Sequence, residues 1–399
     1  MIVLSYLICN WREYMNPLYQ SYANTLDQLK QQGNYRFFKQ IERHGEYIQL
    51  NQKMMLNLSS NDYLGLALDA QLKRQFIQQY PIQQQYLTSS SSRLLTGNFE
   101  EYERLEASLT QAFGRTSLLL NSGYHMNVGI LPALSDDKTL IVSDELIHAS
   151  MIDGIRLSKA QKQRYAHQDL KQLEQLLIHA MDHAAIEKII IVTESVYSMD
   201  GDITDLKALV ALKQNYPKVM LYVDEAHAIG VYGDRGLGVA EQMGCIHEID
   251  FLVGTFGKAL ASVGGYLICD EIIREYLINT MRSLIFSTAQ APINMAWTNF
   301  VFQHMQGMTK QRTHLLNISR RLKQAVLAKG LPCPTDSHII PVIYGKNQIA
   351  VEKALQMHDV GFYVLPIRPP TVAVGTARVR ICLHAELEWN QLEALVDVL

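Results

Sequence analysis

Short, almost continuous apolar runs recur between residues 117 and 268, and each is followed by a polar or glycine-bearing loop. The runs, rich in β-branched and aliphatic residues, lie at residues 117–120, 139–142, 188–193, 219–223, 251–253 and 266–268. A strand that is apolar at successive positions must be buried on both faces, as in a parallel sheet covered by helices. We therefore expect a large, mainly parallel α/β domain, with residues 205–216 as one of its covering helices.

The pattern changes on either side of this region. After about residue 290, long helical patterns alternate with shorter apolar runs, which indicates a smaller α+β domain. The helical patterns lie at 292–305, 311–329, 347–359 and 388–398, and the apolar runs at 339–343, 362–365 and 378–383. Before residue 58 the sequence predicts a helical arm at 19–43 and a short hairpin. The expected division is an N-terminal arm at 1–57, a large α/β domain at 58–290 and a small C-terminal domain at 291–399.

Charge and cysteine usage exclude several classes of function. The 36 Lys and Arg residues nearly balance the 39 Asp and Glu residues, which argues against nucleic acid or an anionic membrane as the main partner. The five cysteines are scattered and form no C-x-x-C pair, and the 13 histidines form no H-E-x-x-H motif. Neither a disulfide framework nor a metal site is expected, and a reducing cytoplasm is the expected location.

The N-terminus carries a short apolar segment at residues 2–9. No basic residue precedes this segment, and it runs directly into the polar residues 10–13 without a small-residue cleavage site. It is too short to span a bilayer and does not have the pattern of a signal peptide. We interpret it as an additional N-terminal segment, which initiation at Met15 instead of Met1 would remove.

Five of the expected strands end in a group of polar or glycine-bearing residues. These groups are 121–123 (NSG), 144–148 (DELIH), 194–198 (ESVYS), 224–227 (DEAH) and 255–258 (TFGK). Ligands of open parallel sheets collect at the carboxyl ends of the strands, where helix N-termini also present free N–H groups. No single group is strong support, but their joint placement predicts a site at this edge.

The segment 224–227 permits three interpretations. An acid directly after a buried strand is costly unless a cation satisfies it, so Asp224 is a candidate partner for a protonated ring nitrogen. An isolated Asp at a strand end is, however, more often a helix N-cap or turn residue. The letters DEAH also spell a helicase box, but that function needs an upstream G-x-x-x-x-G-K-[ST] loop. The Gly257-Lys258 pair lies downstream, has a shorter spacing from Gly254 and precedes Ala259, so the helicase interpretation fails.

Lys258 follows the next expected strand, between small and apolar residues. Burial costs a lysine its charge, so a lysine in this setting suggests a reactive amine. Viewed alone, it could equally extend from a loop into water. A simple turn glycine would also explain Gly123, and His148 in isolation is more often a structural or exposed histidine.

Taken together, these motifs resemble those of the α-oxoamine synthases, a family of fold-type I enzymes that depend on pyridoxal 5′-phosphate. The resemblance extends from about residue 26 to the C-terminus. It rests on seven segments in order, namely 61–66 (NDYLGL), 92–97 (SRLLTG), 122–124 (SGY), 143–150 (SDELIHAS), 193–202 (TESVYSMDGD), 224–227 (DEAH) and 255–258 (TFGK). Tyr124 stands where phenylalanine is common in the family, and Ser89 to Ser91 stand where glycine-containing variants are usual.

The resemblance implies a role for each matching residue. Lys258 would bond covalently to the cofactor and act as the catalytic base, and Asp224 would pair with the pyridine nitrogen. The other implied positions are His148 for ring stacking, His227 and Ser198 for the ring hydroxyl, Gly123, Tyr124 and Thr255 for the phosphate, Arg380 for the amino-acid carboxylate, and Arg36, Thr371 and Arg368 for the acyl substrate. No metal is implied. The family works as a homodimer, so Ser287 and Thr288 would serve the phosphate of the partner subunit.

Two C-terminal segments, 367–372 (IRPPTV) and 375–380 (GTARVR), resemble one branch of the family. That branch joins L-alanine to a pimeloyl thioester in biotin synthesis, and the sequence leaves open whether the thiol carrier is coenzyme A or acyl carrier protein. The alternatives are a sister enzyme that uses glycine or serine with another acyl-CoA, and a non-catalytic protein with the same fold. The presence of Lys258 together with Asp224 and His227 argues against the non-catalytic alternative.

Overall fold

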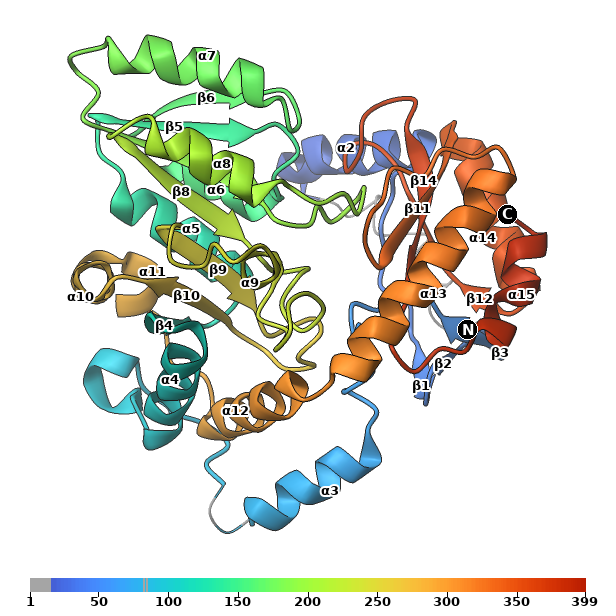
Figure 1. Cartoon of the computed structure of the whole chain (residues 1–399). Coiled ribbons are helices and arrows are strands. Elements are labelled where there is room, and N and C mark those ends of the chain that lie inside the picture. Colours follow the sequence, from blue (N-terminus) through green and yellow to red (C-terminus); the bar gives the residue numbers. More distant parts are fainter. Residues whose placement is uncertain (1–15, 82, 84) are drawn as a thin grey trace.

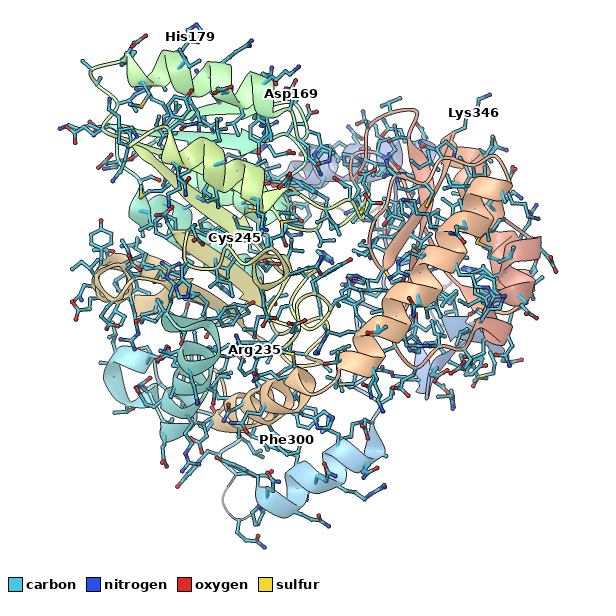
Figure 2. All side chains as sticks on the ribbon, viewed as in Figure 1. Asp169, His179, Arg235, Cys245, Phe300 and Lys346 are labelled. Carbon is cyan, nitrogen blue, oxygen red and sulfur yellow. The ribbon has the colours of Figure 1, made fainter. Side chains whose placement is uncertain are left out.

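The computed structural model describes residues 16–81, 83 and 85–399 (Figure 1). The apolar segment at 2–9, Cys9 and both proposed start residues, Met1 and Met15, lie outside the described residues. No helix within these ranges is long and apolar enough to cross a bilayer. The four cysteines within them are free and buried, and Figure 2 labels one of them, Cys245.

A seven-stranded sheet forms the centre of the larger lobe, in the order β4-β10-β9-β8-β7-β5-β6. Its strands are β4 (Thr116–Leu120), β5 (Thr139–Asp144), β6 (Gln161–Tyr165), β7 (Lys188–Glu194), β8 (Val219–Asp224), β9 (Phe251–Thr255) and β10 (Gly265–Cys269). Only β10 runs against its neighbours, β4 and β9. Because β4 and β9 are both antiparallel to β10, the carboxyl ends of β4, β5, β7, β8 and β9 meet at one edge. The prediction of a mainly parallel α/β sheet is confirmed.

Successive residues of the central strands pack into two different apolar clusters. In β7, Ile190 and Val192 belong to one cluster, whereas Ile189 and Ile191 belong to the other. Helices α5 (Gly123–Leu134), α6 (Ala149–Leu157), α10 (Glu271–Thr280) and α11 (Arg282–Ile285) contribute to the first cluster. Helices α4 (Glu100–Phe113), α7 (Leu170–Met181), α8 (Leu206–Gln214), α9 (Val239–Met243) and α12 (Pro292–Gln306) contribute to the second. Burial on both faces explains why these strands are apolar at successive positions.

The smaller lobe contains an antiparallel sheet in the order β11-β14-β13. Its strands are β11 (Ile339–Gly345), β13 (Leu365–Ile367) and β14 (Ala377–Cys382), and the helices of this part are α13 (Thr309–Ala328), α14 (Asn347–Asp359) and α15 (Trp389–Asp397). In Figure 1 these elements, in orange and red, lie to the right of the larger lobe. The remaining helical elements are η1 (Pro17–Tyr19), α2 (Gln20–Gln31), α3 (Ala70–Gln79) and η3 (Arg93–Gly97).

The N-terminal strands pair with the C-terminal part of the chain. β1 (Glu42–His44), β2 (Tyr47–Leu50) and β3 (Lys53–Asn57) form an antiparallel run, and β3 pairs in parallel with β12 (Phe362–Tyr363). The predicted domain limits after residues 57 and 290 stay predictions. The structure adds that α12, just beyond the second limit, packs on α4 of the larger lobe.

Two local expectations differ from the structure. The predicted helix at 19–43 is too long, because α2 ends at Gln31 and Gly33 has a φ of 67°. A glycine in this left-handed conformation just past the last turn is a common helix stop. The sequence also did not reveal β6, since four of its five residues are exposed and polar, as an edge strand allows.

Candidate active site

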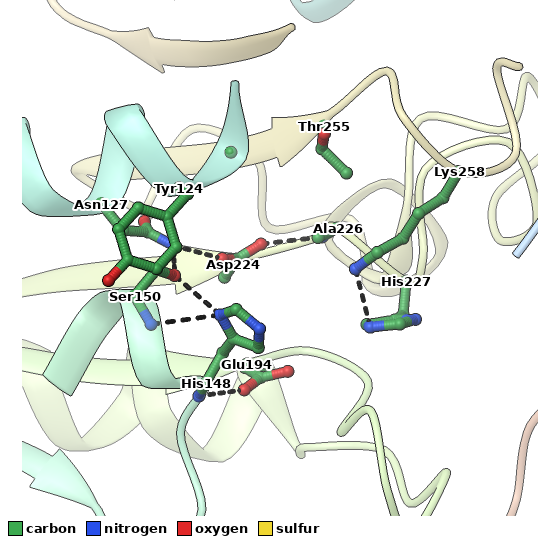
Figure 3. Close-up of a pocket in the computed structure, with 11 residues that line it drawn as sticks. Tyr124, Asn127, His148, Ser150, Glu194, Asp224, Ala226, His227, Thr255 and Lys258 are labelled. Carbon is green, nitrogen blue, oxygen red and sulfur yellow. Dashed lines mark hydrogen bonds between the residues drawn. The ribbon is translucent and has the colours of Figure 1, made fainter. Parts of the chain in front are cut away.

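A cavity of about 170 Å³ lies at the edge where the parallel strands end (Figure 3). It is lined by Gly123, Tyr124, Asn127, His148, Ser150, Glu194, Asp224, Ala226, His227, Thr255 and Lys258. Seven of the residues predicted from the sequence are in this set, and they come from the ends of β4, β5, β8 and β9. The parallel arrangement brings them together because each strand delivers its following loop to the same edge.

Asp224 is the last residue of β8 and is only 5% exposed. Its Oδ2 accepts a hydrogen bond from Asn127 Nδ2 at 2.9 Å, and its Oδ1 accepts one from the backbone N–H of Ala226 at 2.9 Å. The Asn127 amide is itself held by the Tyr222 hydroxyl, which donates to Asn127 Oδ1 at 2.5 Å. These donors, rather than the N-terminus of a helix, hold the Asp224 carboxylate. The carboxylate faces the cavity.

The Lys258 amine reaches the cavity from the loop after β9. Its Nζ lies 2.7 Å from Nε2 of His227, and Nδ1 of His227 lies 2.7 Å from the Tyr63 hydroxyl. Burial lowers the pKa of Lys258 to about 8, although the carboxyls of Asp224 and Glu194 act in the opposite direction. Burial also holds the pKa of His227 well below its usual range, so its imidazole is neutral near pH 7.

His148 precedes α6 and is fixed from two sides. Its Nδ1 lies 2.7 Å from Ser150 Oγ, and its backbone N–H donates to Glu194 Oε1 at 2.6 Å. Asn127 Nδ2 donates to Ser150 Oγ at 2.9 Å, so one amide connects His148 to Asp224. Burial lowers the pKa of His148 and raises that of Glu194 well above its usual range. The neutral imidazole therefore presents a flat, uncharged ring to the cavity beside the Asp224 carboxylate (Figure 3).

The start of α5 and Thr255 line another part of the cavity. A Cβ added to Gly123 would lie 3.4 Å from the Thr255 Cβ, so glycine leaves this gap open. The Thr255 hydroxyl donates to the Gly264 carbonyl at 2.8 Å and accepts from the Gly257 N–H at 3.2 Å. The free N–H groups of a helix N-terminus favour an anionic group such as a phosphate. Tyr124 is half exposed, and its hydroxyl donates to Asp153 at 2.5 Å.

The residues fit pyridoxal 5′-phosphate by their chemistry. The cofactor needs a primary amine that can bond its aldehyde, a carboxylate for its ring nitrogen and N–H donors for its phosphate. Lys258, Asp224 and the start of α5 provide these three groups on one cavity. No group of three or more metal-ligating side chains occurs within the ranges that the structure describes.

Five of the residues predicted to serve this chain's own site lie outside the cavity lining. The Arg380 Nε donates to the Ser198 carbonyl at 2.6 Å, and its Nη2 donates to the Tyr63 hydroxyl at 3.5 Å. Arg368 donates to the Gly33 carbonyl at 2.7 Å, so its loop touches the arm that carries Arg36. Arg36 and Thr371 are exposed. Two segments more than 300 residues apart in the sequence therefore meet, but the roles assigned to these five residues stay predictions.

Several functional candidates were not found from the sequence. Asn127 lies inside a helix, where neither periodicity nor a strand end marks it, and Ser150 ends the 143–150 motif but received no role. Glu194 was noted only as the start of a strand-end group. Asn61 and Tyr63 belong to the 61–66 motif but received no role, because only the folded chain brings Tyr63 to His227.

Comparisons with known proteins agree with this geometry. Residues 53–399 match the aminotransferase class I and II family. The chain is 54% identical over 380 residues to a putative 8-amino-7-oxononanoate synthase of Pasteurella multocida, covering 95% of this chain and 98% of the relative. It is also 54% identical over 387 residues to the 8-amino-7-oxononanoate synthase of Haemophilus ducreyi, covering 95% and 99%.

Solved structures share the fold over most of the chain. A serine palmitoyltransferase variant from S. paucimobilis, with PLP and myriocin bound, superposes with a TM-score of 0.87 at 26% identity, covering 96% of this chain and 97% of the other. The 8-amino-7-oxononanoate synthase of Francisella tularensis gives 0.73 at 26% identity, covering 86% and 96%. The fold-type I architecture expected from the resemblance is thereby confirmed. The chain is an enzyme of the aminotransferase class I and II family and, within it, belongs to the 8-amino-7-oxononanoate synthases.

Proposed function

We propose that the chain joins L-alanine to a pimeloyl thioester with loss of CO2, giving 8-amino-7-oxononanoate and the free thiol carrier for biotin synthesis. The observation that carries this proposal is the Lys258 amine and the Asp224 carboxylate facing one cavity, with the His148 ring beside them. The names of the relatives at 54% identity support the choice of substrates. We propose that this acyltransferase is cytoplasmic, in keeping with the four free, buried cysteines that the structure describes.

The cavity residues would hold pyridoxal 5′-phosphate, which supplies an electron sink for a carbanion when it is bound. Lys258 would hold the aldehyde carbon, Asp224 the ring nitrogen and His148 the ring face. Gly123, Tyr124 and Thr255 would surround the phosphate, and His227 with Ser198 would lie near the ring hydroxyl. The N–H groups of Asn127 and Ala226 donate to the Asp224 carboxylate and fix its direction, so that it would hold the ring nitrogen in the protonated form.

Lys258 is the proposed base. Its pKa of about 8 leaves part of the amine neutral near pH 7, so Nζ can take the α-proton of alanine and later return it. A lysine with an ordinary pKa would be almost fully protonated at that pH. Burial of the amine is therefore what makes it a base.

Arg380 is proposed to bind the alanine carboxylate through its planar guanidinium. Its Nε is already held by the Ser198 carbonyl, which orients the remaining N–H groups. Arg36, Arg368 and Thr371 are proposed to contact the acyl thioester where the arm meets the C-terminal loop. The protein is proposed to act as a homodimer, in which Ser287 and Thr288 approach the phosphate of the partner subunit.

A substrate panel tests the proposal. The purified protein with PLP is incubated with alanine, glycine or serine and with pimeloyl, acetyl or palmitoyl thioesters of coenzyme A and acyl carrier protein, and the products are weighed by mass spectrometry. We expect a product only from alanine with a pimeloyl thioester. A product from glycine or serine with another acyl group would instead identify a sister enzyme, and the absence of any product would indicate a non-catalytic protein.

A further inference from the structure

A continuous row of hydrogen bonds runs from Arg380 to Lys258. Arg380 Nη1 donates to Asn61 Oδ1 at 3.2 Å, and Arg380 Nη2 donates to the Tyr63 hydroxyl at 3.5 Å. The Tyr63 hydroxyl lies 3.0 Å from Asn61 Oδ1 and 2.7 Å from His227 Nδ1. His227 Nε2 completes the row, 2.7 Å from Lys258 Nζ.

Arg380 determines the orientation of the Asn61 amide. A guanidinium has N–H donors and no acceptor, so the amide atom that faces it must be the oxygen. Turning the amide over would place its NH2 group beside the Arg380 N–H groups and the Tyr63 hydroxyl. The contact with Arg380 would then join two donors. The Asn61 oxygen is therefore fixed, and it can only accept.

The Asn61 oxygen in turn determines where the Tyr63 proton points. Tyr63 is completely buried, and burial raises its pKa, so it keeps its single O–H proton. Two oxygens 3.0 Å apart need a proton between them, and only Tyr63 can supply it. The Tyr63 oxygen is then left as an acceptor toward Arg380 and toward His227.

We propose that Tyr63 is a positioning residue that keeps the proton of His227 on Nδ1, so that Nε2 is the acceptor for the Lys258 amine. A neutral imidazole carries one proton, and the acceptor oxygen of Tyr63 beside Nδ1 holds that proton there. Nε2 then bears a lone pair toward Lys258 Nζ. Arg380 thus acts on the reactive amine through Asn61, Tyr63 and His227, without touching it.

Other titratable groups also face this pair, but none of them contacts Nδ1 of His227. Asp224, Glu194, Arg380 and Cys382 face Lys258, and Lys258, Arg380, His338 and His148 face His227. The His338 ring lies edge-on to Tyr63 at 4.1 Å between centroids, and neither of its nitrogens has a partner among the described residues. Tyr63 is therefore the group that decides the position of the His227 proton.

The inference rests on the proposed function only in taking Lys258 as the reactive amine. Its first test does not need the cofactor. The full-length protein is labelled with 15N-histidine, and the His227 signals are assigned by their loss in His227→Gln. We expect the wild-type spectrum, with and without added PLP, to show a protonated Nδ1 and an unprotonated Nε2.

Tyr63→Phe removes the acceptor from Nδ1, and a buried unpaired N–H is unfavourable. The proton should then move to Nε2, where the neutral Lys258 amine can accept it. Asn61→Ala, which frees the Tyr63 proton to turn toward Nδ1, should produce the same change if Tyr63→Phe does not fold. Asn61→Asp keeps an acceptor for Arg380 and Tyr63 and should retain the wild-type tautomer.

The second readout is the pH dependence of the reaction of Lys258 with PLP, trapped by borohydride and located by peptide mass. An Nε2 acceptor favours the ammonium form of Lys258, so its loss in Tyr63→Phe should move the midpoint to lower pH by about one unit. Tyr266→Phe is the matched control, since it removes an equally buried hydroxyl that has no hydrogen-bond partner among the described residues.

The outcomes separate this inference from the proposed function. A wild-type His227 with its proton on Nε2, a tautomer unchanged in both Tyr63→Phe and Asn61→Ala, or an equal change in Tyr266→Phe would each overturn the role of Tyr63. Failure of Lys258 to react with PLP at any pH would instead overturn the proposed function, while the tautomer result would stand.

Discussion

The surroundings of its amine distinguish Lys258 from an exposed lysine, because its half-buried side chain lines the cavity. Its amine is enclosed with two carboxyls and an arginine, and its hydrogen-bond partner is an uncharged imidazole. Lys346, labelled in Figure 2, is exposed and does not line the cavity. The chemistry of the site thus depends on where the backbone places one side chain.

Lys258→Ala should abolish turnover because no other amine of the described residues lines the cavity. The absorbance band of the covalently held cofactor should disappear, while circular dichroism stays that of the wild type. Lys346→Ala is the control and should retain both activity and the band. Normal turnover by Lys258→Ala would show that another group is the base.

The rate should depend on pH through the same amine. Only the neutral form of Lys258 can take a proton, so below a pKa of about 8 the competent fraction falls as the pH falls. We expect kcat/KM to decrease by about tenfold per unit well below that pKa, measured by release of the free thiol between pH 5.5 and 9. A rate that stays constant from pH 5.5 to 8 would contradict the assignment.

At the scale of elements, the contact between α5 and α6 supports the site. Gly154 in α6 faces the backbone of α5 so closely that an added Cβ would lie 2.3 Å from the Asn127 carbonyl oxygen. The two helices carry Asn127 and Ser150, which connect Asp224 to His148. The spacing of two helix backbones therefore fixes the distance between the carboxylate and the imidazole.

Gly154→Ala should push these helices apart. We expect a loss of about 1–3 kcal/mol in the free energy of unfolding, as for overpacked cores, together with weaker binding of PLP, because Asn127 moves away from Asp224. Urea unfolding and absorbance titration with PLP measure the two effects. Gly307→Ala is the control, since Gly307 has a φ of −79° and an added Cβ would meet its nearest atom only at 3.6 Å. Equal stability and affinity of the two variants would refute the role of the helix contact.

At the scale of the whole molecule, a strand from the N-terminal part of the described chain pairs with a strand from its C-terminal part. β3 pairs with β12, so the N-terminal strands are part of a sheet completed by residue 363.

Phe286 is 71% exposed and lies two residues before Thr288, whose backbone pairs with Ser92. An exposed aromatic side chain here is expected at the interface of the proposed homodimer.

Phe286→Glu should weaken this dimer, because a charge would replace an apolar contact. We expect the dissociation constant to rise by about tenfold or more, with a matching loss of PLP affinity if the partner's residues approach the phosphate. Sedimentation at several protein concentrations measures the first effect. Ile272→Glu, at a similarly exposed position on α10, is the control. Unchanged sedimentation of Phe286→Glu would exclude this face from the interface.

Much of the fold followed from local sequence. The six predicted strands of the large sheet are present because strands buried on both faces must be apolar throughout, a property that short segments carry by themselves. The polar β6 and the early end of α2 could not be placed by the same rule. An edge strand needs no apolar face, and one glycine is sufficient to stop a helix whose pattern continues.

The sequence by itself determined the sheet and the strand ends, and it singled out Lys258, Asp224 and His148, because covalent order places each of them at the end of a strand or in the loop that follows it. Only the tertiary structure decided that Asn127 donates a hydrogen bond to Asp224. The same holds for the contact of Tyr63 with His227 and for that of Arg380 with Tyr63. These contacts join residues about 100 to 320 positions apart, from Asn127 to Asp224 and from Asn61 to Arg380. Hydrogen bonds depend on distance and direction in space, which no local pattern of side chains encodes.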